Sequence, residues 1–158
     1  MPQDMPAPAH TTPPVFELTS FFEGHTRAWG IFEDRFGRVR QRIFIEMHGR
    51  WEGAQFILDE RFTYGTGETE LRTWTVRPGT DGRFEATCPE CVGVATGSCE
   101  PERVKMAYDF RLKLQSREIV VTFDDQLHRV DDRRAVNRAR MSKWGVRLGE
   151  LSLLLERV

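Results

Sequence analysis

Apolar and polar residues alternate one by one over long parts of this chain. In the stretch KMAYDFRLKL, residues 105–114, charged or small residues separate the apolar ones. The apolar positions are Met106, Tyr108, Phe110, Leu112 and Leu114. Successive side chains of a β-strand point to opposite faces of the sheet, so this pattern predicts a strand with one apolar face. Residues 118–128 repeat the pattern, and the short connection between the two stretches predicts a hairpin.

Turn-forming sequences recur along the chain at the spacing that an antiparallel meander needs. They are FG at 36–37, HG at 48–49, YGTGE from 64, PGTDG from 78, CEPE from 99 and VDDR from 130. The segments between them number about ten, which is typical of an all-β sandwich or barrel. Because closure removes the exposed edges of a sheet, we predict a single antiparallel up-and-down β-barrel of about 8–10 strands.

The two ends of the predicted barrel domain differ in pattern. The segment FELTSFFEG, residues 16–24, can form a short N-terminal helix that caps one end of the barrel. Residues 147–158 could be taken as a helix, but their leucines alternate with polar residues, so we predict the last strand there.

Length and charge restrict the classes of protein that the chain can belong to. With 158 residues the chain suits one domain, which we place at residues 15–158. Five prolines among residues 1–14 predict a disordered tail.

The 23 basic and 24 acidic side chains nearly cancel, so the sequence predicts no nucleic-acid partner. We find no signal peptide and no apolar run that could insert into a membrane, which favours the cytoplasm; monomer and homodimer both stay open.

All three cysteines lie in CPECVGVATGSC, residues 88–99. A structural zinc site needs four ligands, usually in two close-spaced pairs, whereas this stretch has one pair, Cys88 and Cys91, and the single Cys99. A redox pair is expected at the N-terminus of a helix, which the local pattern does not predict. We therefore interpret the stretch as strand and assign no metal site and no cofactor, with zinc or redox chemistry as the weaker alternative.

Several charged residues fall on faces that are otherwise apolar. Glu60 shares its face with Phe56, Leu58 and Phe62. Arg72 shares the face of Trp74 on the next predicted strand, so we expect Glu60 and Arg72 to form a buried ion pair.

Towards the C-terminus, the same alternation places Asp125, Asn137 and Lys143 on apolar faces. The strand of Asn137 and Lys143 has an uncertain register, because a shift by one residue would exchange its faces and turn Arg138 and Arg140 inward.

Four segments resemble a known bacterial family. They are RAWGIFEDRFGRVR (27–40), GRWEG (49–53), LDERFTYGTGETELRTW (58–74) and NRARMSKWGVRLGE (137–150). They are similar to the family known as domain of unknown function 3833, many members of which look like lipoproteins with an export signal. The resemblance implies a lipocalin-like barrel and no established activity. At the position of the usual lipocalin glycine-x-tryptophan, this chain has Ala28, Trp29 and Gly30.

The predicted barrel leads to a hypothesis of function. We expect a binding module for a small, mainly apolar molecule with one polar or anionic end inside the barrel. The expected ligand-binding residues are Trp29, Glu60, Arg72, Tyr108, Asp125, Asn137, Lys143 and Trp144, and Phe110 and Phe123 add apolar wall.

Three alternatives stay open. In the first, the protein is an enzyme that uses Glu60 or Asp125 as a general acid or base in the same cavity. In the second, the buried charges form a structural network in a filled barrel. In the third, the protein binds a partner through its outer surface. The chain has no GxSxG, P-loop or GxGxxG motif, so we assign no catalytic residue.

Overall fold

The structure is a computed structural model that describes residues 15–158. The disordered tail predicted for residues 1–14 lies outside the described residues. The described part contains one short helix and ten strands. Their bounds are α1 Leu18–Phe22, β1 Gly24–Asp34, β2 Val39–Glu52, β3 Gln55–Tyr64, β4 Thr69–Pro78, β5 Arg83–Thr87, β6 Cys91–Cys99, β7 Arg103–Lys113, β8 Glu118–Arg129, β9 Arg134–Lys143 and β10 Val146–Arg157.

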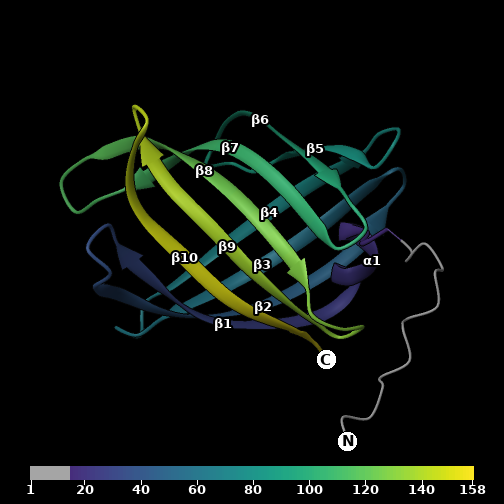
Figure 1. Ribbon diagram of the computed structural model, residues 1–158, viewed down its shortest axis with the longest axis horizontal. Coiled ribbons are helices and arrows are strands. Elements are labelled where there is room, and N and C mark those ends of the chain that lie inside the picture. The colour runs from purple at the N-terminus through teal and green to yellow at the C-terminus, as the bar shows by residue number, and fades with distance from the viewer. Residues whose placement is uncertain (1–14) are drawn as a thin grey trace, which may run out of the picture.

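The ten strands form one closed antiparallel barrel, in which each strand pairs with its neighbours in the chain (Figure 1). The first and last strands close the sheet, with Trp29 of β1 opposite Leu154 of β10. This arrangement confirms the predicted up-and-down barrel, the short N-terminal helix and the strand at the C-terminus.

The apolar residues on alternate strand positions fill the barrel as two clusters. The larger cluster includes Phe56, Leu58, Trp74, Val104 and Leu127. A smaller cluster lies around Phe110, Val121 and Met141, with Phe123 packed against it. The period of two that predicted the strands therefore also divides interior from exterior residues.

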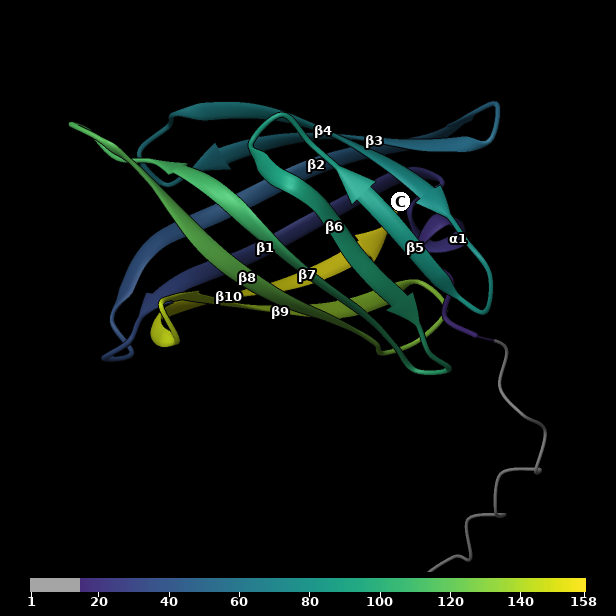
Figure 2. The same cartoon turned by 90° about the horizontal axis from the view of Figure 1, so that it is seen from above.

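The helix α1 covers one end of the barrel, beside the end of β5 (Figure 2). Phe16, Phe21 and Phe22 are all buried there, and their rings pack edge to face. Gly49 of β2 makes this approach possible, because a Cβ at this position would lie 2.1 Å from the carbonyl oxygen of Phe22. No helix in the described part of the chain has the length and apolar character needed to cross a membrane.

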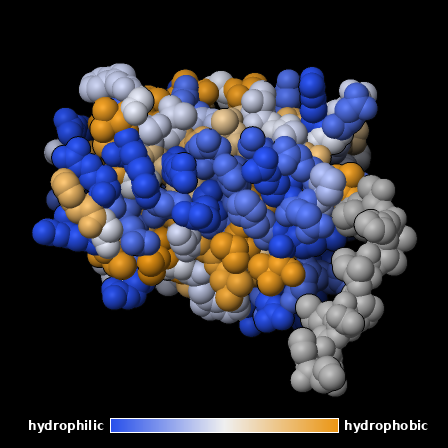
Figure 3. Space-filling view, viewed as in Figure 1, coloured by the Kyte–Doolittle hydropathy of each residue, from blue (hydrophilic) through white to orange (hydrophobic). Residues whose placement is uncertain are grey.

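The outer surface is mainly hydrophilic, with an apolar area over β1 and β10 (Figure 3). Trp29 and Leu154 face each other across this strand pair and are 44% and 45% exposed. The ring of Trp29 packs against Phe44 of β2, with 5.8 Å between the ring centroids.

We predict that Gly49→Ala lowers the free energy of unfolding by about 1–3 kcal/mol, because the added methyl group pushes α1 off the barrel. Urea unfolding followed by fluorescence measures this change. Gly65→Ala is the control, since the nearest atom to a Cβ at that position is 3.5 Å away. The control should stay within about 0.5 kcal/mol of the parent protein. Equal stability of the two variants would show that α1 does not need the close approach.

Candidate functional site

A cavity of about 140 Å³ lies inside the barrel. Most of its wall is apolar and comes from α1 and from inward positions of the strands. This apolar wall includes Leu18, Phe22, Phe84, Val104, Leu127 and Leu155. The helix therefore contributes directly to the cavity as well as covering the barrel end.

Five polar residues also line the cavity: Glu60, Arg72, Tyr108, Asp125 and Asn137. They come from five different strands, β3, β4, β7, β8 and β9. Glu60 lies directly opposite Arg72 in the pairing of β3 with β4. Asn137 lies opposite Leu127, so the register of β9 is the one that turns Asn137 inward, and Arg138 is exposed. All five were expected from the sequence to face the interior.

Arg72 is held tightly in the barrel interior. Its guanidinium lies between the rings of Phe62 and Phe110, with 4.6 Å from its central carbon to each ring centroid. Its side chain is only 14% exposed. A cation placed on aromatic faces away from water gains a favourable electrostatic interaction with each ring.

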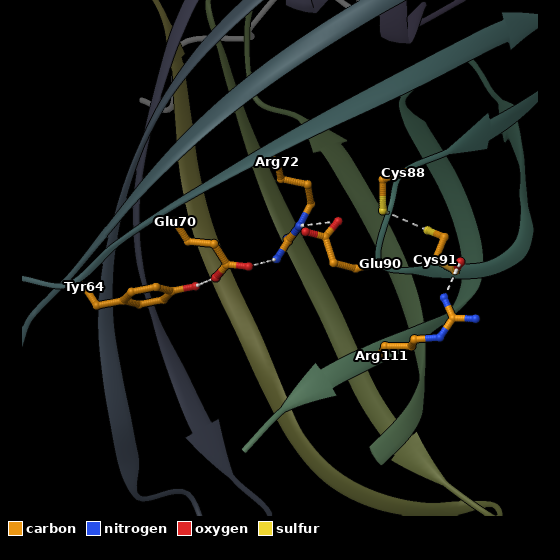
Figure 4. Close-up of polar contacts among 7 residues, drawn as sticks. All are labelled: Tyr64, Glu70, Arg72, Cys88, Glu90, Cys91 and Arg111. Atoms are coloured by element: carbon orange, nitrogen blue, oxygen red, sulfur yellow. Dashed lines mark hydrogen bonds and ion pairs between the residues drawn. The ribbon is translucent and has the colours of Figure 1, made fainter. Parts of the chain in front are cut away.

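The close carboxylate partners of Arg72 differ from the expected one. The guanidinium Nη2 donates to Glu70 at 3.0 Å, and Nε lies 3.9 Å from Glu90 (Figure 4). The Tyr64 hydroxyl in turn donates to the second oxygen of Glu70 at 2.7 Å. The predicted ion pair of Arg72 with Glu60 is therefore corrected: the two residues face each other, but the guanidinium binds Glu70 on its own strand.

Two carboxyl groups of the cavity have strongly raised pKa values. Burial raises the pKa of Glu60 to about 7, against the opposing effect of the Arg72 charge. Burial also raises the pKa of Asp125 to about 7, although a hydrogen bond from Tyr108 works against it. Both side chains keep a little accessible surface because they face the cavity, but protein surrounds them.

The surroundings of Asp125 leave part of this carboxyl without a partner. The Tyr108 hydroxyl donates to Oδ2 at 3.3 Å, and burial raises the pKa of Tyr108, which keeps this donor protonated. The other oxygen, Oδ1, is buried and has no well-aligned hydrogen bond from residues 15–158, although the nearby Asn137 amide acts as a weak donor that lowers the pKa of Asp125. Buried polar atoms of this kind are rare in folded proteins and call for an explanation.

Three of the predicted site residues lie outside the cavity. Trp144 and Gly145 both have positive φ angles, 52° and 75°, and form the turn between β9 and β10, which leaves Trp144 91% exposed. Lys143 ends β9, and its Nζ donates to the carbonyl of Val120 at 2.8 Å. Trp29 points outward because its neighbours Ala28 and Gly30 occupy the crowded interior, where a Cβ on Gly30 would lie 1.9 Å from Ser152 O.

Phe110 and Phe123, which were expected in the ligand wall, also do not line the cavity. They belong to the second apolar cluster, where their ring centroids are 5.8 Å apart. Phe110 acts on the site indirectly, since it covers one face of Arg72.

The cysteine stretch forms strand β6 from Cys91 to Cys99, and Cys88 lies in the preceding connection. The sulfur atoms of Cys88 and Cys91 are 3.0 Å apart, and Arg111 donates to the Cys91 carbonyl at 3.3 Å (Figure 4). The hydrogen bond from Cys88 lowers the pKa of Cys91 and raises that of Cys88. Within residues 15–158, no group of three or more histidine, cysteine or acidic residues is placed to hold a metal ion.

The raised pKa values of Glu60 and Asp125 predict that the protein is less stable at about pH 8 than at about pH 5. Between their ordinary values and about 7, these carboxyls bind protons in the folded state but not in the unfolded state. The free energy of unfolding therefore falls as the pH rises through this window, by a few kcal/mol per group.

Urea unfolding at the two pH values measures this loss. Asp125→Asn should reduce the loss, since the amide cannot ionise, whereas Asp132→Asn at an exposed position that does not affect either pKa should leave it unchanged. An identical pH dependence in both variants would mean that Asp125 titrates normally.

Comparison with solved structures finds proteins with a similar overall fold. The S-type phycobiliprotein lyase CPES from Guillardia theta matches with a TM-score of 0.62 and 6% sequence identity, over 87% of this chain and 88% of the lyase chain. The structure of EF1p2_mFAP2b bound to DFHBI matches with a TM-score of 0.48 and 8% identity, over 87% and 95% of the two chains. At these identities the similarity concerns the fold.

Comparison at the level of sequence identifies the family. No curated protein matches the chain. The family model described as protein of unknown function (DUF3833) matches residues 3–157, which is nearly the whole chain. The chain therefore belongs to the DUF3833 family.

Proposed function

We propose that this barrel binds a small, mainly apolar molecule whose polar end lies among Glu60, Arg72, Tyr108, Asp125 and Asn137. The observation that carries the proposal is the cavity itself, which has an apolar wall and one group of converging polar side chains. Sites for small molecules typically combine a mainly apolar lining with a few polar groups that fix the orientation of the ligand.

The size of the cavity restricts the guest. An engineered apolar cavity of about 150 Å³ binds benzene, and the cavity of this barrel is of similar volume. Most drug-sized ligands occupy roughly 300–1,000 Å³. A single-ring molecule, or a short aliphatic chain with one polar group, therefore fits the barrel in its present conformation.

The cavity favours binding over the alternative of a filled structural barrel. A purely structural polar network would satisfy its own hydrogen bonds, because a half-satisfied buried network is unfavourable. Here Asp125 Oδ1 lacks a partner, and the adjacent space is large enough for a guest.

The expected cytoplasmic location and the oligomeric state stay predictions.

The two raised pKa values favour an enzyme as the second candidate function. A general acid or base works best when its pKa lies near the working pH, and both Glu60 and Asp125 have pKa values of about 7. In this alternative, one carboxyl would accept a proton from a bound substrate and the other would donate one. Mass spectrometry that follows the mass of a bound molecule over time tests this alternative. The parent protein should convert the molecule, whereas Glu60→Gln and Asp125→Asn should bind it without turnover.

We predict that Ala86→Phe strongly weakens binding of benzyl alcohol, a neutral probe that fits the cavity volume. Ala86 lines the cavity and is 1% exposed, so the added ring would occupy the space of the guest. Isothermal titration calorimetry should show a loss of affinity of about tenfold or more, as expected when the buried contact area of a small ligand is removed.

Ala107→Phe is the matched control, because Ala107 is exposed on β7 and the same ring would extend into solvent. Thermal unfolding of both variants shows whether each is folded. Undiminished binding by a folded Ala86→Phe variant would place the probe outside the barrel and contradict the proposed function.

A further inference from the structure

We propose that the polar end of the guest is positively charged, so that the protein binds a small apolar amine in its ammonium form. This inference rests on the proposed function and specifies its ligand class. It replaces the anionic end that the sequence left open. Three features of the barrel interior lead to it: an excess of carboxyl groups, an arginine that already has carboxylate neighbours, and an acceptor oxygen without a well-aligned donor.

Acidic groups outnumber basic ones around the cavity. Glu60 and Asp125 line it, and Glu70 and Glu90 adjoin it through Arg72. Arg72 is the only basic residue in this group of five. Because charges interact strongly where water is excluded, this interior repels a further anion and attracts a cation.

Arg72 already has two carboxylate neighbours inside the protein, although its buried Nε donates no hydrogen bond to residues 15–158. Glu70 accepts its Nη2–H at 3.0 Å, Glu90 lies 3.9 Å from Nε, and the rings of Phe62 and Phe110 cover both faces of the guanidinium. A carboxylate guest at Arg72 would compete with the carboxylates of Glu70 and Glu90, which lie 3.0 and 3.9 Å from the guanidinium nitrogens. The positive charge of Arg72 is therefore already offset in part by acidic residues of the protein itself.

Asp125 provides the contact point for a donor. Tyr108 donates to Oδ2, whereas Oδ1 is buried next to the cavity and has no well-aligned donor among residues 15–158. Glu60 and Asn137 line the same space, and each has an acceptor oxygen, while the Asn137 amide N–H lies toward Asp125 and lowers its pKa. An ammonium group has three N–H donors and no acceptor, which matches this group of oxygens.

A bound ammonium would also reduce the repulsion among the carboxyl groups around the cavity. Like charges on Glu70 and Glu90 contribute to the raised pKa of Glu60, and the Glu60 charge contributes to that of Asp125. A bound cation would favour the ionised carboxylates and bring both pKa values down. A neutral hydroxyl can donate one hydrogen bond to Asp125 but cannot offset this repulsion.

Three probes of the same ring size test the inference: benzylamine, benzyl alcohol and benzoate. At about pH 8, calorimetry should show benzylamine binding at least about tenfold more tightly than benzyl alcohol, as expected for a charge-assisted hydrogen bond, and benzoate most weakly. If benzyl alcohol binds as tightly as benzylamine, or benzoate binds more tightly, the inference is wrong and the proposed function stands. If none of the three binds, the proposed function itself fails.

Two variants test the role of the carboxyls directly. Asp125→Asn and Glu60→Gln keep the shape of each side chain, so each should weaken benzylamine binding about tenfold and change benzyl alcohol binding by less than about threefold. Asp132→Asn, at an exposed position that does not affect the pKa of Glu60 or Asp125, should change neither. Retained benzylamine affinity in both cavity variants would overturn the inference, and their benzyl alcohol affinity shows that the cavity is intact.

The pH dependence of binding gives a separate readout. The groups that face the bound ammonium are Glu60, Arg72, Tyr108 and Asp125, with Glu70 and Glu90 behind Arg72. As the pH falls from about 8 to about 6, protonation of Glu60 and Asp125 should weaken benzylamine binding and leave benzyl alcohol binding nearly constant. Benzylamine binding that does not change over this range would contradict the assignment.

Discussion

The pairing of β1 with β10 is the contact on which the rest of the structure depends. It joins the two ends of the sheet along the register from Thr26–Arg157 to Asp34–Gly149. Without it both strands would present unpaired backbone groups, which invite association with other chains. The same pairing completes the cavity, because Leu153 and Leu155 of β10 form part of its wall. Closure therefore pairs both edge strands and creates the interior of the barrel.

The interior combines apolar packing with buried charged groups, two arrangements that are seldom found side by side. Apolar side chains fill two clusters, and a buried guanidinium with its carboxylates lies beside them. A buried ion pair is tolerated only when its geometry offsets the loss of hydration. Arg72 meets this condition only in part: it donates to Glu70 and lies between two aromatic faces, but its Nε, like Asp125 Oδ1, is buried without a hydrogen-bond partner among residues 15–158. The cavity adjoins the residues for which the protein itself supplies an incomplete set of partners.

The alternation of side chains was enough to predict the strands, the closed barrel and the inward positions of Glu60, Arg72, Asp125 and Asn137. A period of two assigns faces reliably where large apolar residues mark one of them. It failed at Trp29, because the inner residues of β1 are small where strands pack closely, and an aromatic residue then faces out.

The same rule also failed where a strand ends. Trp144 lies in the turn after β9, and Lys143 is the last residue of that strand. The partners of Arg72 could be found only in part from the sequence. Glu70 lies two residues before it on the same face of β4, but Glu90 comes from the connection between β5 and β6, whose path the sequence does not reveal.

The attachment of α1 has a kinetic consequence for any molecule inside the barrel. Passage between most strand pairs would break ladders of backbone hydrogen bonds, and passage past Arg72 would separate its partly buried ion pairs with Glu70 and Glu90. At the other end, one turn of helix is held by packed phenylalanine rings, one backbone hydrogen bond from Phe16 to Glu100 at 3.1 Å and a bridge from Glu23 to Gly49. This five-residue segment is a part of the cavity wall that can open locally, so a change in its packing can alter exchange of the contents with solvent without any change in the barrel.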